Sequence, residues 1–143
     1  MLQGSINHVS LSVSDLDAAM GFFEPLLSFL GYTIGDKLDY QDRQLTVNVN
    51  ERNGTAVNVW QAKLEHPFEV YEPGLHHVCW NVASHAQVDE LAEMLPGIGG
   101  EILDGPGEFP FAENGYYAVY FLGPDRMKFE VVHMPELEAL LPG

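Results

Sequence analysis

Cysteine and basic residues are both scarce in this sequence, and each shortage excludes a class of protein. The single cysteine, Cys79, cannot form an internal disulfide, which is typical of proteins from a reducing compartment. Only 6 lysines and arginines stand against 21 aspartates and glutamates, which gives a formal net charge of −15. A surface of this sign repels phosphate backbones, so we expect no nucleic-acid partner.

Long apolar runs and nucleotide-binding motifs are missing as well. No apolar stretch reaches the roughly 20 residues that cross a bilayer, and the first residues lack the basic and apolar regions of a signal peptide. Neither GxGxxG nor GxxxxGK(S/T) occurs, so nothing indicates a nucleotide cofactor. We therefore expect a soluble cytoplasmic protein without a membrane partner.

The sequence does contain one module written twice. One offset aligns His8 with His77, together with the apolar residues that follow each histidine, and an offset three residues longer aligns Asn58 with Glu130. Internal repetition of this kind indicates the architecture of a whole chain. We predict a single domain over 1–143, made of module one at 4–62, a linker at 63–73 and module two at 74–134.

Each module is predicted to consist of a strand, a helix and three further strands. Polar and apolar residues alternate over 5–13, as in a strand with one dry face, and Asp15 and Ser84 supply helix caps. The predicted strands are 5–13, 32–34, 45–50, 55–61, 75–82, 101–103, 116–122 and 127–133. The fold class is α+β, with two βαβββ modules forming a paired, cup-shaped mixed sheet and the helices outside. The segment 104–114 is predicted to be a loop, either a lid over a cavity or a plain surface connection.

Four polar residues occupy related positions in the two modules. His8 and His77 lie on the polar faces of the first strands, and Asn58 and Glu130 are repeat partners in the last strands. Two imidazoles and a carboxylate are a common ligand set for a divalent transition metal. A carboxylate inside an apolar strand is costly unless it is paired, exposed or bound to metal. The alternative is that each histidine is an ordinary hydrogen-bonded strand residue.

The order of these elements resembles the vicinal oxygen chelate superfamily, which includes glyoxalases, bleomycin resistance proteins and extradiol dioxygenases. The segments that carry the resemblance are Ile6-Asn7-His8-Val9, His76-His77-Val78, Gly123-Pro124-Asp125 and Phe129-Glu130-Val131. It implies a divalent metal (Zn, Ni, Mn, Fe or Co) held by His8, His77 and Glu130. Asn58 stands at a fourth position, where many relatives have a glutamate or glutamine. His76 is expected on the opposite strand face, in a structural or second-sphere role.

The resemblance also implies a small-molecule pocket and a reaction type. Glu130 and Tyr120 are the expected catalytic residues. The expected pocket residues are Ser10, Asn48, Trp60, Cys79, Tyr120, Phe109 and Phe111. We expect a metal-dependent enzyme of the glyoxalase type (lyase, isomerase or transferase) that chelates vicinal oxygens of its substrate. An extradiol-type dioxygenase and a non-enzymatic binding protein of the bleomycin-resistance type stay open as alternatives. Pairing of the modules within one chain or across a homodimer stays open too.

Overall fold

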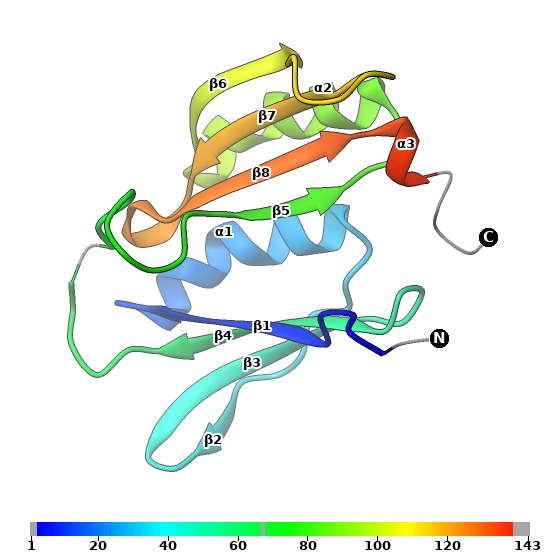
Figure 1. Cartoon of the computed structure of the whole chain (residues 1–143). Helices are drawn as coiled ribbons and strands as arrows, with labels where there is room; N and C mark the ends of the chain where they lie inside the picture. Colours follow the sequence, from blue (N-terminus) through cyan, green and yellow to red (C-terminus); the bar gives the residue numbers. More distant parts are fainter. Residues whose placement is uncertain (1–2, 67, 139–143) are drawn as a thin grey trace. The chain divides into compact units, whose positions relative to one another are not determined.

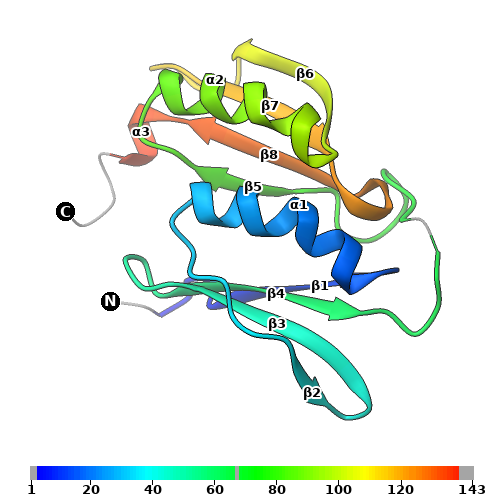
Figure 2. The same cartoon turned by 180° about the vertical axis from the view of Figure 1, so that it is seen from behind.

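The computed structural model describes residues 3–66 and 68–138, and the chain divides into two compact units, 1–67 and 68–143. Each unit contains one βαβββ module with its own four-stranded mixed sheet, as the α+β prediction required (Figure 1). Figure 2 shows the same elements from behind. Within the described residues, no helix is both long and apolar enough to cross a membrane.

The first unit is built from one helix and four strands. Its elements are β1 (His8–Val13), α1 (Leu16–Phe29), β2 (Leu38–Tyr40), β3 (Arg43–Asn50) and β4 (Thr55–Gln61). The sheet order is β1-β4-β3-β2, with β1 parallel to β4 and the other pairs antiparallel. The Asp15 carboxylate caps α1 by accepting from the Ala18 N–H at 3.0 Å, because the first turn of a helix has no backbone acceptors of its own.

The second unit repeats this order. Its strands are β5 (Val78–Asn81), β6 (Glu101–Glu108), β7 (Tyr117–Leu122) and β8 (Lys128–His133), and its helices are α2 (His85–Met94), η1 (Leu95–Ile98), η2 (Pro124–Arg126) and α3 (Pro135–Glu138). The sheet order is β5-β8-β7-β6, with β5 parallel to β8. α2 packs its buried Val88 and Leu91 on one face of this sheet, so the opposite face is left to carry the polar residues.

The strand registers show the repeat at the level of single residues. Ser10 of β1 lies opposite Asn58 of β4, and Cys79 of β5 lies opposite Glu130 of β8. Asn58 and Glu130 therefore occupy the same position in their respective sheets.

Several predicted strands and the predicted loop have different bounds in the structure, and the first strands of both modules begin three residues later than predicted, at His8 and Val78. The segment 32–34 makes only a single bridge, between Thr33 and Val49, and the fourth strand of the first sheet is β2. β6 continues to Glu108, so about half of the segment predicted as a loop is strand. Glycine and proline suggested a loop, but β6 is an edge strand with two register shifts, where a missing N–H is tolerated. A side chain at Gly105 would meet the Ala118 carbonyl oxygen at 2.5 Å, so this strand needs glycine there.

Candidate functional site

The buried carboxylate of Glu130 is the centre of the polar face in the second unit. Its side chain is only 2% exposed, between the cross-strand neighbours Cys79 on β5 and Tyr120 on β7. A buried charge is costly unless hydrogen bonds compensate it. Both carboxylate oxygens have a partner: His77 Nε2 lies 2.9 Å from Oε1, and the Tyr116 hydroxyl donates to Oε2.

Tyr116 is a site residue that the sequence interpretation missed. Tyr116 lies just before β7, and its carbonyl accepts from the Phe109 N–H just after β6. The hydrogen bonding between β6 and β7 therefore continues to Tyr116, whose backbone is extended. Tyr116 and Tyr120 are four residues apart in extended chain and therefore share a face. Burial and the hydrogen bond to Glu130 raise the pKa of Tyr116, so this phenol remains a donor at neutral pH. The period-two spacing of the tyrosines is the signal that could have found it.

Tyr120 has a raised pKa as well. Burial is the main cause and the negative charge of Glu130 adds to it, while a hydrogen bond with Tyr116 acts in the opposite direction. The net effect raises the pKa of Tyr120 to about 12, so this side chain is also a neutral phenol at physiological pH.

His76 contacts His77 directly. Their Nδ1 atoms are 2.8 Å apart, so one of these nitrogens donates and the other accepts. Because the Glu130 carboxylate accepts, His77 Nε2 carries the proton in this pair, and in a neutral His77 the bare Nδ1 accepts from His76. The expectation that His76 faces away from His77 is wrong. β5 begins only at Val78, and the alternation of side chains does not apply to residues before the strand.

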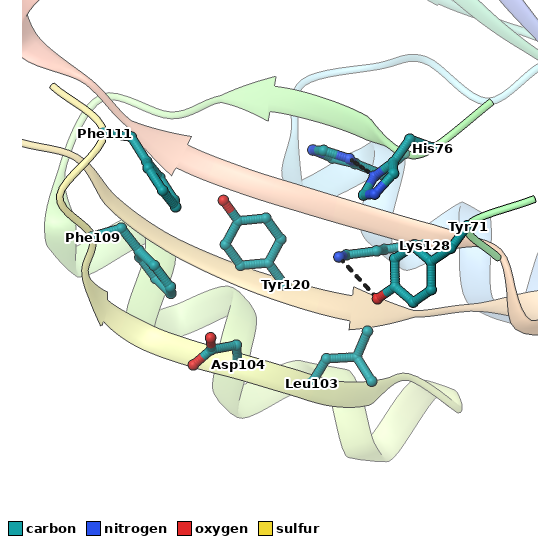
Figure 3. A pocket seen from close by; sticks show the side chains of 9 residues that line it. Tyr71, His76, Leu103, Asp104, Phe109, Phe111, Tyr120 and Lys128 are labelled. Atoms are coloured by element: carbon teal, nitrogen blue, oxygen red, sulfur yellow. Dashed lines mark hydrogen bonds between the residues drawn. The ribbon is translucent and has the colours of Figure 1, made fainter.

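A cavity of about 450 Å³ opens beside the two histidines (Figure 3). In the view, Phe109 and Phe111 lie on one side of the Tyr120 ring, and Lys128 and Tyr71 lie on the other. Pockets of this size with aromatic walls and a few polar groups are typical of small-molecule sites. The lining residues are Tyr71, His76, His77, Leu103, Asp104, Phe109, Phe111, Tyr120 and Lys128.

The second unit thus brings together most of its predicted site residues. Tyr120, Phe109 and Phe111 line the cavity next to His77. Cys79 lies beside Glu130 on the sheet but is not part of the cavity wall. Although Cys79 is partly open to solvent, the protein around it and the Glu130 carboxylate raise the pKa of its thiol, so it is no activated nucleophile.

The first unit holds the remaining predicted residues on β1, β3 and β4. His8 is exposed at the start of β1, where its Nδ1 lies 2.8 Å from the Asn7 side-chain oxygen. Asn58 and Ser10 are neighbours, with 3.5 Å between the amide nitrogen and the hydroxyl oxygen. The Asn58 side-chain oxygen is buried and has no hydrogen-bond partner among the described residues. Trp60 shares this face and packs edge-on against Tyr40.

Asn48 is a correction to the predicted pocket. Val47, not Asn48, lies opposite Asn58 in the sheet, so Asn48 is on the other face. There it is fully buried and donates to the Thr46 hydroxyl and the Val57 carbonyl, while its own oxygen accepts from the Gly35 N–H. Its hydrogen-bonding capacity is used to tie the 30–35 segment to β3 and β4, which gives it a structural role.

The His77–Glu130 pair fits a divalent metal ion. Imidazole nitrogen and carboxylate oxygen bind such ions at about 2.0–2.2 Å, so two ligands at a right angle lie about 2.9 Å apart. The observed 2.9 Å between His77 Nε2 and Glu130 Oε1 is the length of their hydrogen bond, and it leaves both atoms close enough to bind one ion. Over the described part of 68–138, no group of three His, Cys, Asp or Glu side chains suited to a metal gathers. This unit therefore offers two ligands of such a site.

Comparisons with known proteins agree with this architecture. A family model, the Glyoxalase/Bleomycin resistance protein/Dioxygenase superfamily, matches residues 5–131. The uncharacterised protein YqjT of Bacillus subtilis (strain 168) is 34% identical over 131 residues, which cover 89% of this chain and 97% of YqjT.

Two solved structures illustrate the likeness in three dimensions. A protein of Bacillus halodurans assigned to the glyoxalases is 28% identical, with a TM-score of 0.73, and the match covers 93% of this chain and 98% of that one. The fosfomycin resistance protein FosX of Listeria monocytogenes is 17% identical, with a TM-score of 0.67 and coverage of 99% and 100%, which shows the fold alone. The FosX structure holds Mn(II) and 1S,2S-dihydroxypropylphosphonic acid.

Proposed function

This chain belongs to the glyoxalase/bleomycin resistance protein/dioxygenase superfamily, and we propose that it is a metal-dependent enzyme of the glyoxalase type. Its substrate would be a small molecule that presents two neighbouring oxygens to the metal, and the reaction would be that of a lyase, isomerase or transferase. The observation that carries the proposal is the buried Glu130 carboxylate, held by Tyr116 and set 2.9 Å from His77 beside an aromatic cavity.

Three residues are proposed to hold the metal. His77 and Glu130 have the separation and donor chemistry of two ligands. His8 is proposed as the third, on its repeat relationship to His77, and Asn58 stands at the fourth position as a neutral and weaker ligand. The bound ion would supply Lewis-acid chemistry, by polarising the oxygens of the substrate. Mn, Fe, Co, Ni and Zn are all compatible with nitrogen and oxygen donors.

The neighbouring side chains prepare these ligands. Tyr116 occupies one oxygen of Glu130, which leaves Oε1 for the ion. A metal-bound His77 would have a bare Nε2 and carry its one ring proton on Nδ1, and His76 would then accept from that N–H and fix the ring. Tyr120 is a neutral phenol at the cavity wall and can donate a hydrogen bond to a substrate oxygen. Glu130 and Tyr120 are therefore the proposed catalytic residues.

The aromatic wall of the cavity supports one other candidate function. Phe109 and Phe111 stack at 5.8 Å between ring centroids, as expected of a surface that sequesters flat molecules without a reaction. The two functions differ in their dependence on metal, since a pure binder needs none.

The test is a reaction screen with reconstituted protein. Untagged protein is loaded with each of the five metals and assayed with 2-oxoaldehydes plus thiols, with epoxides plus thiols or water, and with catechols under oxygen. The proposal predicts turnover with a non-catechol substrate that is lost on adding chelator and in Glu130→Gln. Ring cleavage of catechols would instead identify an extradiol dioxygenase. Ligand binding without turnover for every substrate and metal would favour the sequestering function.

A further inference from the structure

Lys128 is placed unusually for a chain with so few cations. It begins β8, two residues before Glu130, so both side chains project from the same face of the sheet. Its ammonium lies in the cavity wall and donates to the Tyr71 hydroxyl at 3.1 Å. Figure 3 shows these two groups pointing toward each other beside Tyr120. Among the described residues, no carboxylate lies within ion-pair distance of Lys128, although the sequence has 21 acidic residues.

The ammonium is held in position by two aromatic rings. Lys128 Nζ lies 4.9 Å from the ring centroid of Tyr71 and 5.2 Å from that of Tyr120, within the range of cation–π attraction. Tyr71 is itself in contact with His76, at 5.1 Å between ring centroids. A lysine ammonium has three donor hydrogens, and the Tyr71 hydroxyl accepts one of them. A half-buried cation with donors to spare favours an anionic ligand that supplies acceptors.

The far side of the cavity has a different character. Phe109 contacts Tyr120 edge-on at 5.2 Å, and Phe111 stacks on Phe109 while remaining 62% exposed. Exposed aromatic side chains that line a cavity are available to cover a flat apolar group. Asp104 also reaches the cavity, but its side chain is exposed, and solvent screens the effect of an exposed charge on a ligand.

We propose that this cavity binds small molecules that join a flat apolar group to a carboxylate, and that Lys128 holds the carboxylate. The apolar group would lie against Phe109 and Phe111. This assigns a substrate class to the site of the proposed function, and it rests on that function only for the statement that the cavity is where substrate binds. The anion contact itself does not depend on a metal ligand.

The test compares benzoate with benzamide, which has the same shape and no charge. Both are titrated into isotope-labelled protein, and affinity and location are read from the amide chemical shifts. A charge-assisted hydrogen bond predicts benzoate binding about tenfold more tightly than benzamide. The shifts should centre on Tyr71, Lys128 and the Phe109–Phe111 wall.

Three variants and one chelator control separate this proposal from the metal site. Lys128→Met should reduce benzoate to the affinity of benzamide, whereas Lys128→Arg keeps the charge and should keep the preference. Asp104→Asn removes the negative charge that also reaches the cavity, so it should preserve or increase the preference for benzoate over benzamide. Adding a metal chelator should leave the preference for benzoate unchanged, so failure of the metal site leaves this result intact. Equal binding of the two probes by the wild type, a preference that survives in Lys128→Met, shifts confined to another surface, or no binding of either probe would each overturn the proposal.

Discussion

Asn58 occupies in the first module the position that Glu130 occupies in the second, each opposite the equivalent residue of a parallel neighbouring strand. The two positions differ in how their polar groups are satisfied. Glu130 has partners on both oxygens, whereas the buried Asn58 oxygen has none among the described residues. A buried acceptor without a donor costs free energy, so this position is suited to a ligand or water that supplies one.

Asn58→Glu is expected to raise metal affinity under the proposed function. A second carboxylate would add negative charge to a site that holds a divalent cation, and opposite charges at ligand distance favour binding. A competition titration with a chelator at constant pH measures the change. Unchanged or weaker affinity in a well-folded variant would mean that residue 58 is not beside the metal.

Tyr116→Phe is expected to lower the free energy of unfolding by about 1.5–3 kcal/mol at neutral pH. The reason is that a buried carboxylate loses a charge-assisted hydrogen bond and keeps its desolvation cost. Urea denaturation at constant ionic strength measures this. Tyr40→Phe is the matched control, because Tyr40 is exposed and no hydrogen bond to its hydroxyl occurs in the described structure, so its effect should stay within about 0.5 kcal/mol. Equal effects of the two substitutions would argue against a role for the Tyr116 hydroxyl.

The raised pKa of Tyr120 predicts a loss of stability at alkaline pH. The folded state keeps this phenol protonated up to about 12, whereas the unfolded chain releases the proton near the ordinary value of about 10. The native state thus binds more protons in this window, so stability falls as pH rises from about 10 to about 12. The ultraviolet absorbance of tyrosinate should show a late component whose amplitude falls in Tyr120→Phe. A single titration near the ordinary value in the folded protein would contradict the assignment.

The apolar residues between α2 and the second sheet should contribute more to the free energy of unfolding than the polar residues on the opposite sheet faces. Leu91 is fully buried on the inner face of α2, so Leu91→Ala is expected to cost about 2–5 kcal/mol through lost burial and a cavity. Ser10→Ala replaces an exposed side chain on β1 and should cost much less. Denaturant melts of the two variants make the comparison, and a larger loss for Ser10→Ala would invert the orientation assigned to the strands.

The repeat was the most informative feature of the sequence. It predicted two βαβββ modules and the equivalence of Asn58 with Glu130, because a parallel strand pair repeated in both modules preserves its register. Alternation inside β8 also predicted that Glu130 would lie away from the apolar residues packed by α2. These inferences depend only on the geometry of regular strands.

Two residues that sequence reasoning missed or misplaced, His76 and Tyr71, lie where that geometry does not apply. His76 precedes its strand, and Tyr71 lies outside any regular element, so no alternation fixes their directions. Asn48 was misplaced because polarity was taken to indicate the pocket face. Its face is buried, where its oxygen accepts from the Gly35 N–H and its amide nitrogen donates to the Val57 carbonyl and the Thr46 hydroxyl. The hydrogen bonds to Gly35 and Val57 join segments that are distant in the sequence, so residue spacing within one strand does not predict them.

The most direct test of the proposed metal-dependent function is the metal content of untagged protein purified without chelator. Wild type is expected to hold about one divalent ion per chain, measured by elemental analysis against protein concentration. His77→Ala should lose most of it while keeping the wild-type circular dichroism spectrum. His66→Ala, which removes an exposed histidine whose described hydrogen bonds are made by its backbone, should keep it. Equal metal content in wild type and His77→Ala, or no metal in wild type even after reconstitution, would contradict the account.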